Sequence, residues 1–209
     1  YDEVEETVAA NTLGTVIHET LEDLYKPVVN EILTENHLVA MIKSTGITVE
    51  KHFKSYFKEG DITKGKNLII FEIAKRYITN FLNKELETVK AGNIIKIIAL
   101  EQEIKIPIAI PQLGFPVSLR GTVDRVDVCN GVTRIIDYKT GRVDQNKVEI
   151  VDWEDLTTDY DKYSKSFQIM TYAYMMNEME PFLNFVEGGI ISFKNLQGDY
   201  FLKFAKKDK

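Results

Sequence analysis

The chain has 209 residues and a formal net charge of −6, with 44% hydrophobic and 28% charged residues. These proportions are typical of a soluble globular protein, and no apolar run reaches the roughly 18 residues of a membrane-spanning helix. The acidic total argues against a protein that coats nucleic acid through bulk positive charge. It does not exclude an enzyme that acts on nucleic acid, because acidic metal ligands contribute to the same total.

The single cysteine, Cys129, excludes an internal disulfide and any site built from four thiolates. One free cysteine fits a reducing compartment, and the acidic start "YDEVEETVAA" lacks the features of a secretory signal. We therefore expect a cytoplasmic protein without membrane attachment. Because the chain starts without methionine and ends in "KKDK", we expect a fragment of a larger protein.

Three helices are predicted in the N-terminal part. Residues 11–34 carry apolar side chains at steps of three and four, and Pro27 predicts a kink or break there. Residues 47–59 and residues 65–90 repeat the helical period. We expect this helical part to occupy about residues 1–92.

The pattern then changes to the period of strands. Residues 93–110 alternate isoleucine with other side chains, and residues 117–128 and 132–139 are two further predicted strands. An Asn-Gly pair joins the last two and favours a hairpin. Residues 140–160 are polar and predict a loop.

The C-terminal part returns to helix and then to strand. Residues 161–178 have helical period and are closed by Pro181, and residues 185–193 and 200–205 predict two strands. This order predicts an α+β fold in which helices flank a central sheet of about five strands. We expect one domain over residues 1–209, with the sheet core from about residue 93.

The segment "RIIDYKTG" ends an apolar strand with an acid and a base. Residues two apart share a face of a strand, so Asp137 and Lys139 point the same way. A cross-strand ion pair at the rim of a sheet would explain these residues alone. However, antiparallel pairing across the turn would bring Asp124 near Asp137, and two carboxylates repel unless a cation lies between them. Oxygen ligands of this kind suit Mg²⁺ or Mn²⁺.

Two further polar groups lie on predicted helices. His18 is beside the apolar row of the first helix, one turn before Glu22, where it could be a packed histidine or a ligand for Mn²⁺. Gln168 and Tyr172 are four residues apart on one face of the later helix. They could hydrogen-bond to a phosphate or to a metal ligand, or they could simply interrupt an amphipathic helix.

The order of these motifs is more specific than any one of them. G-x-x-x-H, G-x-x-D-R-x-D, D-Y-K-T-G and Q-x-x-x-Y follow one another between about Gly14 and Tyr174. This series resembles the RecB-type nuclease family of the PD-(D/E)xK superfamily. The resemblance implies a restriction-endonuclease-like core and a DNA nuclease that depends on Mg²⁺ or Mn²⁺, which we expect to be an exonuclease.

The resemblance also implies a role for each matching residue. Asp124 and Asp137 would be the metal-binding carboxylates, with the carbonyl of Tyr138 and the side chain of His18 as further ligands. Lys139 would orient or activate the attacking water. A lysine beside carboxylates stays protonated, which favours positioning and electrostatic stabilisation over general-base action.

The resemblance also extends to three residues outside the central motifs. Gln168 and Tyr172 would organise the site and contact DNA. Glu101 occupies a position where related nucleases sometimes place another acid, and Glu103 competes for that match.

The same resemblance suggests a cellular context. Related domains form the C-terminal part of AddB- or RecB-like helicase–nuclease subunits in DNA repair and recombination, so DNA and a helicase domain or subunit are the expected partners. The chain has no G-x-x-x-x-G-K-[ST] loop and therefore no ATP site of its own. Some relatives hold an iron–sulfur cluster with four cysteines, and one cysteine here predicts no such cluster.

Three alternatives stay open. The chain could be a catalytically inactive DNA-binding module of the same fold, or a standalone exonuclease of phage or CRISPR type. It could also be an α+β interaction domain whose acids are charges at the rim of the sheet.

Overall fold

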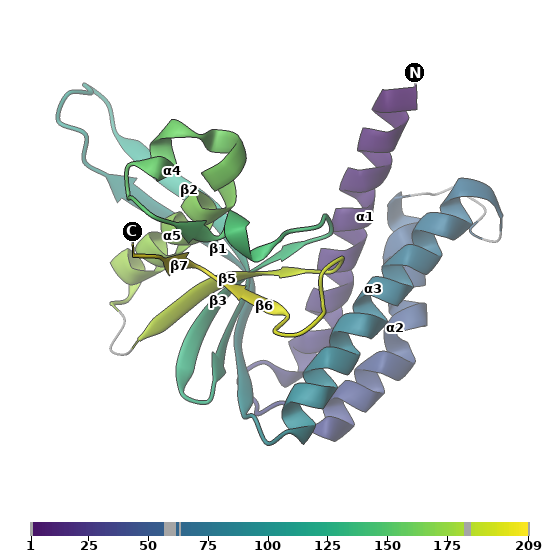
Figure 1. The fold of residues 1–209 in the computed structure, drawn as a ribbon. Helices are drawn as coiled ribbons and strands as arrows, with labels where there is room; N and C mark the ends of the chain where they lie inside the picture. The colour runs from purple at the N-terminus through teal and green to yellow at the C-terminus, as the bar shows by residue number, and fades with distance from the viewer. Residues whose placement is uncertain (1, 57–61, 63, 182–184, 209) are drawn as a thin grey trace.

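The computed structural model describes residues 2–56, 62, 64–181 and 185–208. A five-stranded sheet lies between three N-terminal helices on one face and the helix α5 (Tyr160–Met179) on the other (Figure 1). The strands of this sheet, in spatial order, are β1 (Ile95–Ile108), β2 (Val117–Cys129), β3 (Val132–Lys139), β5 (Val186–Ser192) and β6 (Phe201–Lys203). The predicted α+β class and the number of strands are confirmed.

The first two N-terminal helices begin before their predicted first residues. α1 (Asp2–Tyr25) begins earlier, in a segment rich in the helix formers Glu and Ala. A 3₁₀ turn (Lys26–Val28) follows it, so the break at Pro27 is confirmed, but the helix does not continue to residue 34 as predicted, because Ile32 pairs with Lys96 of β1. α2 (Glu35–Tyr56) also begins earlier than residue 47, since Leu38 and Met41 extend its buried face upstream. α3 (Gly65–Lys90) has its predicted bounds. Residues 57–59 of the second predicted helix lie outside the described residues.

Alternate residues of the central strands serve the two faces of the sheet. Ile136 and Ile191 pack with the three N-terminal helices, whereas their neighbours Ile135 and Ile190 face α5 (Tyr160–Met179). Burial on both faces explains why adjacent residues are apolar in these strands, Ile135 with Ile136 and Ile190 with Ile191. β3 and β5 pair in parallel, and α5 belongs to the connection between them.

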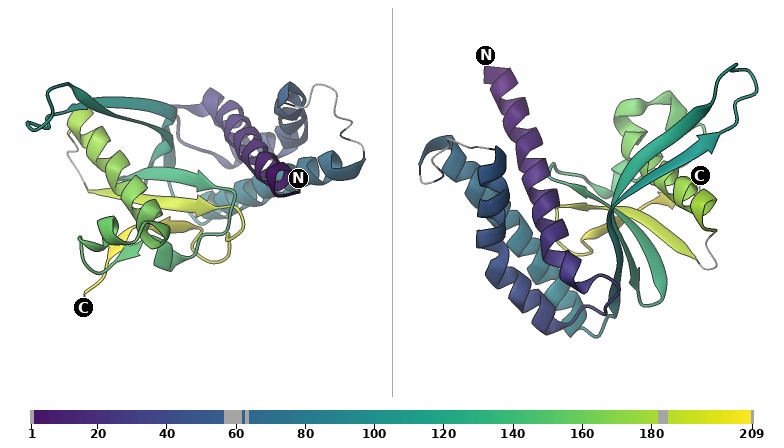
Figure 2. Two further views of the ribbon diagram at one scale, coloured as in Figure 1. Left: turned by 90° about the horizontal axis from the view of Figure 1, so that it is seen from above. Right: turned by 180° about the vertical axis from the view of Figure 1, so that it is seen from behind.

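The hairpin between β2 and β3 turns at Asn130 and Gly131. Both residues have positive φ, 52° and 85°, as a two-residue turn of this kind requires, so the predicted hairpin is confirmed. β2 pairs with β1 along its length but with β3 only from Arg125 to Cys129. Beyond Arg125 the sheet therefore forks, and the hairpin of β1 and β2 continues as a two-stranded arm (Figure 2).

Two predictions for the C-terminal part are wrong. The expected loop 140–160 contains three short elements, because its buried Val143 and Val148 anchor it against α5 and β5. These elements are a 3₁₀ turn (Gln145–Lys147), β4 (Glu149–Ile150) and α4 (Asp155–Thr158). The expected strand 200–205 is divided, since after β6 the chain leaves the main sheet and β7 (Ala205–Lys206) pairs with β4. None of the described helices is long and apolar enough to cross a membrane.

Candidate active site

Asp124 lies at the fork of the sheet, one residue beyond the last paired residues of β2 and β3, Arg125 and Ile136. Continuing that register by one residue sets Asp124 opposite Asp137. The Asp124 carboxylate accepts the backbone N–H of Tyr138 at 2.6 Å, measured from Oδ2 to N. The side chain of Asp124 thus binds the backbone of β3 at the point where the two strands separate.

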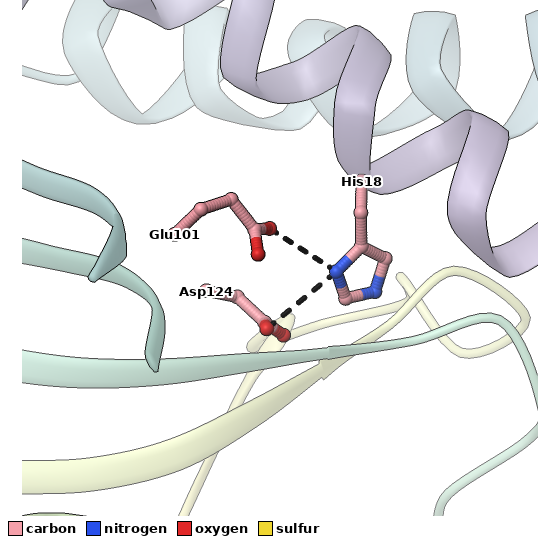
Figure 3. Close-up of side chains that lie close together, drawn as sticks. All are labelled: His18, Glu101 and Asp124. Carbon is pink, nitrogen blue, oxygen red and sulfur yellow. Dashed lines mark hydrogen bonds and ion pairs between the residues drawn. The ribbon is translucent and has the colours of Figure 1, made fainter. Parts of the chain in front are cut away.

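Three side chains from three elements meet at this fork (Figure 3). Nδ1 of His18, on α1, lies 3.2 Å from Oε1 of Glu101 on β1 and 3.5 Å from Oδ1 of Asp124 on β2. One ligand atom from each residue lies within 4.8 Å of the other two. The group offers two carboxylates and an imidazole, a donor set that a divalent cation can use.

The backbone of β1 is unusual at Glu101. Its φ is 43°, a value that non-glycine residues rarely adopt. The pairs Leu100 with Arg125 and Gln102 with Val123 flank it, so Glu101 stands opposite Asp124. Of the two acids that competed in the sequence, Glu101 is the one that contacts His18. Glu103 lines the same groove of about 520 Å³ without joining the three-residue group.

Asp137 and Lys139 form a second group on β3. Asp137 is buried, with 2% of the residue exposed, and its carboxylate Oδ2 lies 2.6 Å from Nζ of Lys139. The two side chains share one face of β3, as the strand period predicts, and they form an ion pair within one strand, not the cross-strand pair considered from the sequence. The structure joins Asp124 with His18 and Glu101, and it joins Asp137 with Lys139. Asp137 is not among the three residues that meet within 4.8 Å.

Burial makes the charged forms of both aspartates unfavourable. Burial raises the pKa of Asp124 to about 7, against the opposing effects of His18 and of the Tyr138 N–H, and repulsion from Asp137 adds to the rise. Burial also raises the pKa of Asp137, although Lys139 opposes it. The pKa of His18 is raised overall: burial lowers it, but the hydrogen bond to Glu101 and the charges of the surrounding carboxylates together raise it by more. A cation bound among these groups would relieve the cost of their burial.

Gln168 and Tyr172 lie on α5 as one unit. Nε2 of Gln168 donates to the phenol oxygen of Tyr172 at 2.9 Å. Tyr172 packs on Gly121 of β2, where an added Cβ would lie only 2.8 Å from Cε1 of the ring. Burial raises the pKa of Tyr172, and the charges of Asp137 and Asp124 add to that effect. The pair therefore lies near the carboxylates, on the arm side of the fork.

The sequence assigned no role to two residues here. Gly121 opens the motif G-x-x-D-R-x-D, and the structure shows that it is needed for the close approach of Tyr172; a glycine inside a strand pattern is the signal that indicates such an approach. Lys165 shares the face of Gln168 and Tyr172, at spacings of three and seven residues, and its charge lowers the pKa of Asp137. Helical spacing could have identified it.

A family model described as "PD-(D/E)XK nuclease superfamily" matches residues 2–195, a span that includes all the residues of this site. No curated protein matches the chain, and no solved structure does.

Proposed function

Because the chain belongs to the PD-(D/E)XK nuclease superfamily, we propose that the fork of its sheet is the active site of a metal-dependent deoxyribonuclease of the RecB type. The meeting of His18, Glu101 and Asp124 within 4.8 Å, beside the pair of Asp137 and Lys139, is the observation that carries this proposal. Nucleases of this superfamily use divalent metals, and the nuclease fold suggests DNA as the substrate. The motif order described above supports the RecB type.

The chemistry of the donors suits Mn²⁺ or Mg²⁺. Glu101, Asp124 and His18 would hold the ion, with Asp137 and the carbonyl of Tyr138 beside them. Bound there, the ion would hold the scissile phosphate, lower the pKa of a water molecule and neutralise charge on the leaving oxygen. The imidazole of His18 favours Mn²⁺ over Mg²⁺.

Lys139 would act on the attacking water and on the charge that develops at the phosphate. Asp137 holds its ammonium group at 2.6 Å, measured from Oδ2 to Nζ, which keeps the group in one position. A fixed cation of this kind stabilises negative charge in a transition state without reorganising during the reaction. Its role would therefore be electrostatic and orienting.

The side of α5 that faces the site would bind the DNA backbone. Gln168 and Tyr172 offer hydrogen-bonding groups, and Lys165 on the same face adds a positive charge that a phosphate would attract. Such contacts position the substrate without reading its sequence.

A cleavage assay with end-labelled single-stranded and duplex DNA tests this function. With Mn²⁺ or Mg²⁺ present, Asp137→Asn should abolish cleavage. Lys139→Ala should lower kcat by about 10²–10³-fold while the Mn²⁺ affinity changes little. Lys84→Ala, which removes a surface lysine of α3, is the matched control and should behave as the wild type. Full metal-dependent activity of Asp137→Asn would show that the site is assigned wrongly.

A circular substrate extends the same assay. We propose exonuclease action, so linear DNA should be degraded and circular DNA should resist. The inactive DNA-binding module remains the second candidate, and it would bind the labelled DNA without any metal-dependent cleavage. The complete set of Asp124, Asp137 and Lys139 favours the enzyme.

The wider context is also a proposal. We infer one nuclease domain over residues 1–209, with a helical part to about residue 92 and a catalytic core after it, in a cytoplasmic DNA repair or recombination complex. The resemblance of the motif order to RecB-type nuclease domains is what supports a helicase domain or subunit as the partner. Copurification of an ATP-dependent DNA-unwinding activity with the nuclease would support this context. A native protein that degrades linear DNA alone, with no copurifying helicase activity, would contradict it and favour the standalone exonuclease.

A further inference from the structure

A group of buried charges lies behind the candidate site, on the face of the sheet that packs against the N-terminal helices. Arg125, next to Asp124 on β2, is fully buried. Its Nη2 lies 2.8 Å from Oε1 of Glu85 on α3 and 2.6 Å from Oδ2 of Asp127, and Glu85 and Asp127 are also 0% exposed. The phenol of Tyr25, at the end of α1, donates to Oε2 of Glu85. We call Tyr25, Glu85, Arg125 and Asp127 the buried charge network.

The network connects the layer that carries His18 to the strand that carries Asp124. The Arg125 guanidinium lies over the ring of Tyr25, with its Cζ 4.8 Å from the ring centre. α1, α3 and β2 therefore meet at one guanidinium, whose planar donors hold their partners in defined directions. His18 belongs to α1, and its distance to Asp124 depends on how these elements are held.

The network also reaches Tyr138, the residue between Asp137 and Lys139. Nη1 of Arg125 donates to the Tyr138 phenol at 3.4 Å. The ring of Tyr138 packs edge-on against His18, with centroids 5.9 Å apart, while its backbone N–H binds Asp124. One residue thus links the buried charges on one face of β3 to the carboxylates at the fork.

Stability alone does not account for these charges. Buried ion pairs contribute little over a well-packed apolar set of similar volume, since desolvation offsets their attraction. The charges balance, because Arg134 binds Asp127 with Nε at 2.7 Å and Nη2 at 2.8 Å, giving two cations to the two anions. The Arg125–Glu85 ion pair and the position of the Arg125 guanidinium over Tyr25 join the two layers at one point. The hydrogen bonds from Arg125 to Asp127 and Tyr138 fix that guanidinium in the sheet, whereas an apolar contact would orient the layers weakly.

We propose that Arg125 and Glu85 are positioning residues of the candidate metal site: their buried pair holds α1, α3 and β2 so that His18 meets Asp124 and Tyr138 is fixed. Metal affinity then depends on two residues that lie outside the metal site. The inference rests on the function proposed above.

The main test variant, Glu85→Gln/Arg125→Met, removes both charges of the pair, so that Arg134 and Asp127 still balance. Glu85→Gln alone, which leaves one buried cation in excess, is the second variant should the double variant fail to fold. Leu82→Ala, at another fully buried position of α3, is the control for lost stability. Mn²⁺ affinity is measured by calorimetry well below the Tm of every variant, together with kcat at saturating Mn²⁺.

The network variants should bind Mn²⁺ about tenfold to a hundredfold more weakly, whereas Leu82→Ala should bind it as the wild type does despite its lower Tm. Arg125→Lys should recover part of the affinity, because it restores the charge without the planar donors. Wild-type affinity in Glu85→Gln and in the double variant would overturn the proposal, and so would an equal loss in Leu82→Ala.

A second measurement separates this inference from the proposed function. In the metal-free protein, ring ¹⁵N NMR signals of His18, assigned with His18→Gln, report its contact with Glu101 and Asp124. These signals should shift in the network variants and stay unchanged in Leu82→Ala. If the wild type neither binds Mn²⁺ nor cleaves DNA, the proposed function fails, and unchanged His18 signals in the network variants would overturn the positioning role independently.

Discussion

The carboxylate of Asp124 should lower the stability of the metal-free protein. Burial raises its pKa from an ordinary value of 3.8 to about 7, so above that pH the folded chain holds a charge that water would solvate better. At ~1.4 kcal/mol for each pKa unit, this difference corresponds to about 4 kcal/mol. The site residue is therefore expected to oppose folding until a cation binds.

We predict that Asp124→Asn stabilises the metal-free chain. The pKa of about 7 already includes the favourable effects of His18 and of the Tyr138 N–H on the charged form, so their loss in the amide subtracts nothing further. The gain of up to about 4 kcal/mol above pH 7 should raise the Tm by about 8–16 °C for a chain of this length.

The sign of the pH dependence follows from the raised pKa. Between about pH 4 and pH 7 the unfolded chain has released the Asp124 proton while the folded chain retains it, so the stability of the wild type falls as the pH rises. The advantage of Asp124→Asn should accordingly grow across this window and reach its full value above about pH 7.

Denaturant unfolding in EDTA from about pH 5 to pH 8 measures this difference. Asp144→Asn, at an exposed aspartate that pairs with Arg142, is the matched control and should change stability little at any pH. Saturating Mn²⁺ should reverse the order, because the wild type gains the free energy of binding. An Asp124→Asn chain that is no more stable than the wild type at pH 8 would refute the claim that burial dominates at this carboxylate.

Two other substitutions test the geometry of the site. Glu101→Gln should weaken Mn²⁺ binding by about tenfold to a hundredfold, while Glu103→Gln should leave it nearly unchanged; calorimetric titration decides, and equal losses would contradict the assignment of Glu101. Gly121→Ala should lower stability by about 1–3 kcal/mol and reduce kcat, because its methyl carbon would lie 2.8 Å from the ring of Tyr172. In a double-mutant cycle, Tyr172→Ala should remove most of the cost of Gly121→Ala, and additive losses would argue against the contact.

Local pattern predicted the elements whose signals are short-range. The bounds of α3 and β3, the Asn-Gly hairpin and the break at Pro27 follow from residue period and backbone restrictions within a few positions. α2 was harder because Ser44, Thr45 and Gly46 are weak helix formers in the middle of its sequence. Its buried face continues through them because tertiary packing overrides propensity.

Contacts between distant segments were beyond such patterns. Glu101 and Glu103 are two residues apart on β1, so the strand period assigns both to the same face. Only the register against β2 decides which of them lies opposite Asp124, and that register contains a shift between Ile97 and Ala99. Glu85 and Arg125 belong to different layers, and nothing in either segment indicates that they pair. The sequence predicted the residue types of the site and that the hairpin would bring Asp124 near Asp137, but it left open which acid of β1 would contact His18.

The fork in the sheet also divides β2 into two parts whose backbone amides should exchange their hydrogens with solvent at different rates. From Val117 to Asp124 the strand borders β1 alone within the described chain, whereas from Arg125 to Cys129 both of its edges are paired. Amides along the open edge should exchange for deuterium through small local openings, and those between β2 and β3 only through larger ones. Asp124 therefore marks the boundary between a slowly and a rapidly exchanging half of the same strand.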